Sequence, residues 1–380
     1  MMWERVKLAD VSDSCLGKML DQRKNKGIYK PYLANVNVRW GAFDLDNLQE
    51  MKFEDDEDER YGIKYGDLII CEGGEPGRCA IWKEQLPNMK IQKALHRLRV
   101  NEEMDYRYVY YWFLLAGKQG ALKQYYTGAT IMHMPGQKLK EVVIDKPPLD
   151  VQRKIGDYLE AFDNLIENNQ KQIKLLEEAA QRLYKEWFVD LRFPGYEDVE
   201  IVDSVPEGWS KEPIGSIIGK ASRTKQIKTA DYLLEGAIPV IDQSRNFIAG
   251  YTNDSEALVN AGTPEIVFGD HTRILKYIQF PFAKGADGTQ LIISDRTNMP
   301  QSLLYLSLIA VDLSNYHYAR HFKYLKAESI LIPSQDVADE FDRLISPIFS
   351  QIQKLREKCY KLSQARDRLL PKLMSGEIEV

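Results

Sequence analysis

The sequence is poor in the residues that build metal centres and disulfide frameworks. Its 380 residues include four cysteines and five histidines, and none of them forms a CxxC pair or has zinc-site spacing. We expect reduced, structural thiols and no resident metal. The first residues do not resemble a signal peptide, and no apolar run has transmembrane length. These absences predict a soluble, cytoplasmic protein without a membrane partner.

Signatures of catalysis are also missing. The chain has no Gly-x-Gly-x-x-Gly, Gly-x-Ser-x-Gly or His-Glu-x-x-His motif. Residues 215–220 resemble a phosphate loop, but the segment is one residue short and no Ser or Thr follows Lys220. We therefore interpret the chain as non-catalytic. The rival hypothesis, an enzyme acting on nucleic acid, requires activity of the purified chain that is lost on changing Lys220.

Positive charge is not in excess. The formal net charge is -5, and acidic residues are concentrated in the run 54–59, which we interpret as a solvated loop. This balance argues mildly against a protein coated with basic surface. It leaves room for a local nucleic-acid-binding surface, because the distribution of charge matters more than its sum.

The chain does contain a long heptad segment that occurs twice. Apolar residues recur at alternating steps of four and three, and the two copies agree at one constant offset. The first seam contains Ile155, Leu159, Phe162, Ile166, Asn169, Ile173, Leu176, Ala180, Leu183 and Trp187. The second seam contains Phe341, Ile345, Ile348, Ile352, Leu355, Cys359, Leu362, Arg366, Leu369 and Leu373. This period predicts two long amphipathic helices that pack on each other as an antiparallel coiled coil.

A few positions interrupt these seams. Asn169 should cost stability and help to fix the register of the pair. Arg366 should extend to the rim or pair with an acidic neighbour. Pro347 and Pro371 should bend or loosen the second helix.

The flanks of the two heptad segments repeat as well. Each segment follows a short strand and a proline break, with Asp150 and Asp336, or Ser334, as expected N-caps. Tryptophan opens both halves, at Trp3 and Trp209. We expect an α+β fold with two similar globular domains separated by two long antiparallel coiled-coil helices, as a pseudo-twofold internal repeat. The expected bounds are 1–146 for the first globular domain, 147–190 for the first long helix, 191–208 for a linker, 209–332 for the second domain and 333–380 for the second helix.

The spacing of the aromatic stretch Tyr106 to Leu115 predicts a helix, and it suits burial in the core better than base stacking. Polar and basic loops are the better candidates for nucleic-acid binding, because binding residues concentrate on loops. Glycines permit close approach to a phosphate, and Arg, Asn and Gln can read base edges. A solvated loop or a plain tight turn remains the alternative for each. The candidates in the first domain are Lys18, Arg23, Lys24, Lys26, Lys30, Gly73, Gly74, Arg78, Thr127, Thr130 and His133. Those in the second domain are Arg223, Lys225, Lys228, Gln243, Arg245, Asn246, His271, Thr272, Arg273, Asp287 and Arg320.

Nearly the whole chain resembles the specificity (S) subunits of type I restriction–modification enzymes. The resemblance rests on Pro147-Pro148-Leu149 opening a long helix, Pro206-Glu207-Gly208-Trp209 opening the second half, and the closing segment 366–376. Residues 71–78 and 92–97 resemble one class of target-recognition domain, and residues 268–273 and 285–288 another. Ser334-Gln335 departs from the first copy, which has Pro148-Leu149.

The resemblance implies two target-recognition domains, each binding one half of a bipartite, asymmetric site in double-stranded DNA. It implies two methyltransferase subunits, which use S-adenosylmethionine to methylate adenine, and two restriction subunits, which use ATP and Mg²⁺. No cofactor would be bound by this chain. The acidic net charge motivates a rival interpretation, a protein-binding coiled-coil scaffold with two adaptor domains and no DNA readout.

Overall fold

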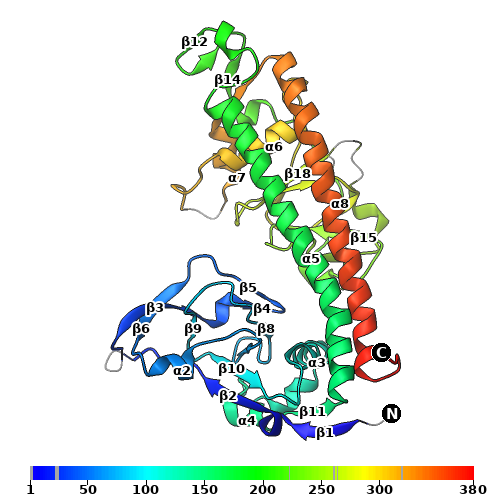
Figure 1. Cartoon of the computed structure of the whole chain (residues 1–380). Coiled ribbons are helices and arrows are strands. Elements are labelled where there is room, and N and C mark those ends of the chain that lie inside the picture. Colours follow the sequence, from blue (N-terminus) through cyan, green and yellow to red (C-terminus); the bar gives the residue numbers. More distant parts are fainter. Residues whose placement is uncertain (1–2, 22–24, 222, 260–261, 263, 318–319) are drawn as a thin grey trace. The chain divides into compact units, whose positions relative to one another are not determined.

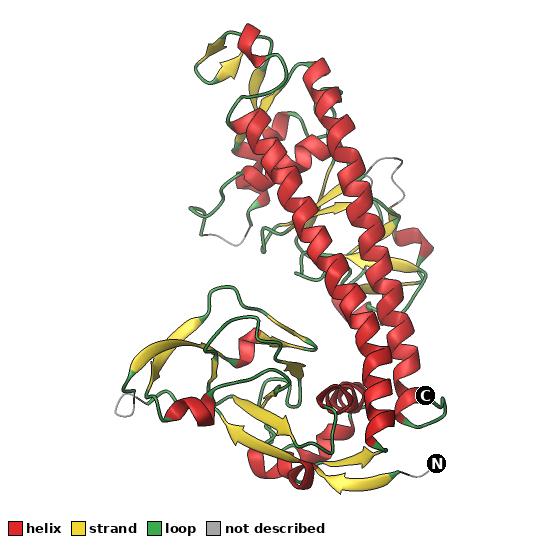
Figure 2. Ribbon diagram, in the orientation of Figure 1, coloured by secondary structure: helices red, strands yellow, loops and turns green. Residues whose placement is uncertain are grey.

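The computed structural model describes residues 3–380 except 22–24, 222, 260–261, 263 and 318–319, and the chain divides into two compact units. Unit 1 comprises Met1–Glu167 and Tyr360–Val380, and unit 2 comprises Asn168–Cys359. Both units contain helices and sheets (Figures 1 and 2), which confirms the expected α+β class. Among the described residues, no helix combines the length and apolar character needed to cross a membrane.

In its described residues, unit 1 contains one four-stranded and one three-stranded sheet. The larger is antiparallel, with the strand order β2 (Ser12–Leu16), β10 (Leu95–Val100), β7 (Leu68–Cys71) and β8 (Cys79–Ile81). The smaller has the order β6 (Gln49–Phe53), β3 (Ile28–Leu33) and β9 (Lys90–Ile91), with β3 and β9 parallel. The other elements are α1 (Leu8–Val11), α2 (Glu57–Tyr61), α4 (Gly136–Lys140), the strand pair β4 (Val38–Arg39) and β5 (Ala42–Phe43), and 3-10 turns at Asn35–Asn37 and Ala121–Tyr125.

The aromatic stretch of unit 1 forms α3 (Tyr106–Lys118), and its N-cap is Asp105, which accepts hydrogen bonds from the backbone N–H groups of Arg107 and Tyr108. Tyr108 and Phe113 are fully buried in the same core as Leu68 of β7. The expectation that these aromatics form core is confirmed.

The described part of unit 2 likewise contains one four-stranded and one three-stranded sheet. One has the order β16 (Gly250–Thr252), β15 (Ile238–Ile241), β20 (Phe282–Lys284) and β17 (Leu258–Val259), with β15 and β20 parallel. The other is antiparallel, with the order β19 (Leu275–Ile278), β18 (Glu265–Gly269) and β21 (Thr289–Ile292). The other elements are α6 (Gln301–Ala310), α7 (Phe322–Ala327), the hairpin β12 (Ile201–Val202) and β13 (Val205–Pro206), and 3-10 turns at Tyr196–Asp198, Ile214–Ser216, Thr229–Asp231 and Ser255–Ala257.

A strand pair precedes each long helix, which confirms the internal repeat. In unit 1, β1 (Glu4–Lys7) pairs antiparallel with β11 (Val143–Lys146), and α5 (Leu149–Tyr184) follows. In unit 2, β14 (Ser210–Pro213) pairs antiparallel with β22 (Ser329–Ile332), and α8 (Gln335–Met374) follows. Asp150 and Asp336 lie inside the first turns rather than at the caps, where a carboxylate still interacts favourably with the helix dipole.

The long helices contact each other within each unit. In unit 2, Arg356 of α8 pairs with Glu177 of α5 at 2.7 Å, and the rings of Phe341 and Trp187 lie 5.4 Å apart. The later residue of α5, Trp187, contacts the earlier residue of α8, Phe341, so the two helices run antiparallel there. A short π-helical turn, Lys185–Val189, ends α5.

The seams expected from the heptad pattern face inward: every member except Arg366 and Asn169 is apolar or sulfur-bearing, and each is buried or partly buried. In unit 1, Arg366 pairs with Asp163 of α5 and with Asp367, so its expected acidic partner is confirmed. α8 runs without interruption through Pro347 and Pro371. Each of the two units includes parts of both long helices. The five expected domain ranges remain a prediction.

Candidate nucleic-acid interface

In unit 2, hydrogen bonds join loops that are far apart in the sequence. Residues 242–246 follow β15, residues 270–274 follow β18, and residues 285–288 follow β20. The parallel pairing of β15 with β20 brings two of these loops to the same sheet edge. The segment before α7 joins them through the backbone N–H of His321, which donates to the carbonyl of Asp270 at 2.8 Å. The candidate interface of unit 2 is therefore a set of mutually supported loops.

Gln243 connects three of these loops. Its Nε2 donates to the carbonyl of Asp287 at 2.9 Å, and its Oε1 accepts from the backbone N–H of His271 at 3.1 Å. The Thr272 hydroxyl donates to the carbonyl of Gln243 at 2.7 Å. At Gly288, φ is +74° and a Cβ would lie 2.5 Å from the His271 ring, so this junction requires glycine. Gln243 thus holds the loops together, and one donor and one acceptor of its amide are engaged within the protein.

Asp270 also connects two of these segments, the loop after β18 and the residues before α7. The sequence did not indicate that this residue is buried. It is buried, and its Oδ1 accepts from the backbone N–H of Phe322 at 2.7 Å. Arg273, with φ of +62°, donates to the carbonyl of Tyr316 at 2.7 Å and to Nε2 of His321 at 3.3 Å. Arg273 is therefore engaged inside the protein rather than presented to a ligand. Only the turn residues around it signalled this loop in the sequence.

The remaining candidates of these loops are exposed. They are Arg245, Asn246, His271, Thr272, Asp287 and Arg320. Exposed cationic and amide groups on supported loops are the kind of surface that reads phosphates and base edges. The segment 223–228, which contains the candidates Arg223, Lys225 and Lys228, contributes less than expected, because Lys225 pairs with Asp254 at 2.7 Å. Arg223 and Lys228 are exposed.

The candidate interface of unit 1 is a lip formed by residues 127–133. Reciprocal backbone hydrogen bonds of 2.8 and 2.9 Å between Thr127 and His133 close it, and Thr127, Thr130 and His133 are exposed. A Cβ at Gly73 would lie 2.9 Å from Nδ1 of His133. Glycine at position 73 thus lets the lip lie directly on the turn after β7.

Glu72 stands beside this lip and was not singled out from the sequence. Burial raises the pKa of its carboxyl group, and the nearby His133 and Lys93 act in the opposite direction. A carboxylate can accept a hydrogen bond from the amino group of cytosine. Glu72, His133 and Lys93 therefore form a mixed polar group at the end of β7.

Arg78 supports the glycine turn instead of offering a free cation. Its guanidinium donates to Glu75 at 3.1 Å and to the carbonyl and side-chain oxygens of Asn35 at 3.2 and 3.1 Å. Asn35 in turn donates to the carbonyl of Gly73 at 2.8 Å. Gly74 is exposed in the left-handed region, with φ of +73°. Arg78 and Asn35 together fix the shape of this turn.

Two of the lysines predicted as binding candidates in the first domain are also engaged internally, and Lys30 lies in strand β3 rather than in a loop. Lys18 is buried, and its Nζ donates to Glu57 at 2.5 Å and to the carbonyl of Lys52 at 2.9 Å. Lys30 donates to Asp58 at 2.8 Å. The acidic run is therefore not simply a solvated loop, since it forms part of α2 and neutralises these cations. Lys26 is exposed, and the predicted Arg23 and Lys24 lie outside the described residues.

Comparison with known proteins gives a consistent assignment. Residues 2–178 match the family model of the type I restriction modification DNA specificity domain. The type I restriction enzyme MjaIX specificity subunit of Methanocaldococcus jannaschii is 28% identical over 343 residues, covering 83% of this chain and 78% of that protein. The MjaVIII specificity subunit of the same organism is 26% identical over 223 residues, covering 57% and 49%.

The fold agrees with a solved structure. The crystal structure of the S subunit of a type I restriction-modification system from M. genitalium aligns with a TM-score of 0.57 at 16% identity, covering 98% of this chain and 96% of that one. At this identity the likeness concerns the fold alone. The family match over residues 2–178 and the sequence relatives show that the chain is similar to the specificity subunits of type I restriction–modification enzymes.

Proposed function

We propose that the chain is the DNA-sequence-specificity subunit of a type I restriction–modification complex. In this proposal unit 1 and unit 2 each read one half of a bipartite, asymmetric target in double-stranded DNA. The observation that carries it is the supported loop set of unit 2, which presents Arg245, Asn246, His271 and Arg320 to solvent. Arg and Asn are the side chains best suited to guanine and adenine, respectively.

The two units would read different half-sites. Unit 1 offers Glu72, Thr130 and His133 around a glycine turn, whereas unit 2 offers exposed Arg and Asn side chains. Different donors and acceptors select different bases. This difference supports an asymmetric target rather than a palindrome.

The partners would dock on the helices. Each long helix keeps some apolar residues exposed, such as Tyr158 and Leu165 of α5 in unit 1 and Leu344 of α8 in unit 2. Exposed apolar patches support protein association. We infer that two adenine-methyltransferase subunits, with S-adenosylmethionine, and two restriction subunits, with ATP and Mg²⁺, assemble with this chain. The catalytic steps would belong to those subunits, and this chain would supply DNA binding and orientation.

Mapping of methylated adenines across a genome tests the proposal. The chain would be co-expressed with its methyltransferase partner, and we expect a two-part motif that depends on the chain. Replacing both Arg245 and Asn246 by alanine should relax one half of the motif and leave the other half intact. Lys211→Met, at an exposed position of β14, is the matched control and should leave the motif unchanged. The absence of any chain-dependent motif would refute the proposal.

The acidic net charge of -5 keeps the scaffold interpretation as the competing function. Binding to DNA through phosphate contacts releases counterions, so affinity must fall steeply with salt. A salt titration of the assembled complex on duplex DNA separates the two. We expect a steep negative slope, whereas a scaffold without DNA readout would show a shallow one.

A further inference from the structure

A buried lysine lies beneath the first loop of the unit 2 interface. Lys276 is in β19 and is 4% exposed. Its Nζ donates to the carbonyl of Asp242 at 2.8 Å and to the carbonyl of Asn246 at 2.5 Å. These carbonyls belong to the first and last residues of the 242–246 loop, so one ammonium group joins both ends of the loop.

The loop is organised around the same point from its own side. The carboxylate of Asp242 lies 3.9 Å from Nζ of Lys276. It also accepts from the backbone N–H of Ser244 at 2.8 Å and from the hydroxyl of Tyr232 at 3.2 Å. Burial lowers the pKa of Lys276 to about 8, against an opposing effect of Asp242. Burying a charge is costly unless hydrogen bonds compensate it, and here the compensation comes from the loop itself.

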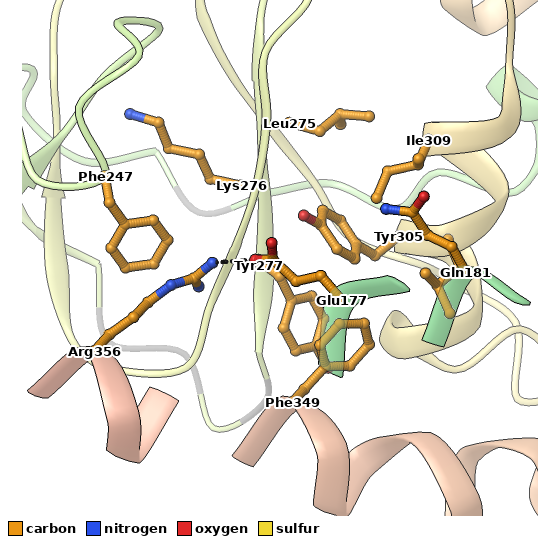
Figure 3. A pocket seen from close by; sticks show the side chains of 11 residues that line it. Glu177, Gln181, Phe247, Leu275, Lys276, Tyr277, Tyr305, Ile309, Phe349 and Arg356 are labelled. Carbon is orange, nitrogen blue, oxygen red and sulfur yellow. Dashed lines mark hydrogen bonds and ion pairs between the residues drawn. The ribbon is translucent and has the colours of Figure 1, made fainter. Parts of the chain in front are cut away.

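The residue after the loop is held separately. The guanidinium of Arg356 lies 4.1 Å from the ring centre of Phe247 and pairs with Glu177 at 2.7 Å. Figure 3 shows the Arg356 side chain directly beside the Phe247 ring. Both residues line a cavity of about 240 Å³ that Lys276 also lines. The loop is thus fixed at both ends by Lys276 and beyond its last residue by Arg356. Between these points it presents Arg245 and Asn246 to solvent.

We propose that Lys276 is a positioning residue that determines specificity at the half-site read by unit 2, by clamping the ends of the 242–246 loop. The lysine itself is too buried to contact a base, so it acts through Arg245 and Asn246. This inference rests on the proposed function for its effect on DNA. The clamp does not depend on the proposed function, because its hydrogen bonds form in the chain without DNA.

The clamp is tested first without DNA, by hydrogen–deuterium exchange of the full chain. Lys276→Met keeps a similar apolar stem and removes every donor. Exchange of the amides in residues 243–249 should become at least about tenfold faster, because hydrogen bonds to a charged group are lost. Lys211→Met is the matched control and should leave this segment unchanged. Unchanged exchange in Lys276→Met would overturn the clamp, whatever the chain does with DNA.

The effect on specificity is tested by methylation mapping with the methyltransferase partner. We expect the Lys276→Met motif to become degenerate in the same half that the Arg245 and Asn246 substitutions relax, with the other half sharp. Faster loop exchange with an unchanged motif would overturn the role in specificity. If the wild-type chain itself directs no motif, the proposed function fails while the exchange result still decides the clamp. Should Lys276→Met not fold, Lys276→Leu, which also removes every donor, takes its place, and wild-type exchange of residues 243–249 in that variant would overturn the clamp.

Discussion

The ion pair between the two long helices in unit 1 gives a quantitative prediction. Arg366 of α8 pairs with Asp163 of α5, and Asp163 also accepts from the hydroxyl of Tyr111 at 2.7 Å. The side chains of Arg366 and Asp163 are 16% and 26% exposed. Breaking a fully buried pair costs about 3–5 kcal/mol, whereas exposed pairs contribute about 0–1 kcal/mol. At this intermediate burial, we expect Arg366→Met to lower the free energy of unfolding of unit 1 by about 2 kcal/mol.

A double-mutant cycle isolates this interaction. Arg366→Met, Asp163→Asn and the double variant would be compared by urea denaturation, with hydrogen exchange of α3 and α5 reporting on unit 1. We expect a coupling energy of about 1–2 kcal/mol, because the residues share one network. Arg182→Met is the control, since Arg182 is 84% exposed and lies 4.0 Å from Glu178; it should cost less than about 0.5 kcal/mol. If Arg366→Met costs no more than this control, the reasoning from burial is wrong.

Three further predictions concern single side chains. Burial and the nearby Arg273 lower the pKa of His321, so its neutral ring accepts the hydrogen bond from Arg273. As the pH falls below about 6.5, the unfolded chain takes up a proton at this histidine before the folded chain does. The melting temperature of the wild type should therefore drop with acid, and that of His321→Gln should drop less. Asn169→Leu should raise the free energy of unfolding by about 1 kcal/mol, because Asn169 is a buried polar member of the seam. A higher melting temperature would show this gain. Lys18→Met should lower the free energy of unfolding by about 2 kcal/mol, since it leaves Glu57 without its cation. The methylation motif should stay unchanged, and a relaxed motif would show that Lys18 takes part in DNA reading.

The sequence predicted the repeated parts of the molecule well. The heptad period depends only on local spacing, so the long helices and their inward faces followed from residues such as Ile155 and Phe341. The strand before each helix was also predictable, because a short apolar run ended at a proline break. The caps were less accurate: Asp150 and Asp336 lie in the first turns instead, whereas Ser334, the alternative for the second helix, directly precedes α8. A cap depends on one backbone conformation, which spacing does not specify.

The loops were predicted only as regions, because composition does not distinguish an exposed cation from an engaged one. Lys18, Lys30, Arg78 and Arg273 all scored as candidates by residue type and position. Their partners, such as Glu57 and Asp58, are distant in the sequence or belong to a run that looked merely solvated. Each of these cations is engaged by a long-range contact that only the fold creates.

Two supporting residues were not predicted, because residue type and spacing do not show long-range contacts. Lys276 and Asp270 sit at or beside buried strands, where a charged residue signals nothing by period or motif. In the structure, one clamps the loop after β15 and the other joins the loop after β18 to the segment before α7. A buried charge is tolerated only where the fold supplies hydrogen bonds, so its position marks where loops must hold one shape. For a surface that has to discriminate bases, rigidity of the loops matters as much as the exposed side chains, because a base-edge contact discriminates only when donor and acceptor are held in place. The exposed Arg245 and Asn246 can therefore be exchanged to change what is read, whereas Lys276 and Asp270 should be needed whatever sequence is read.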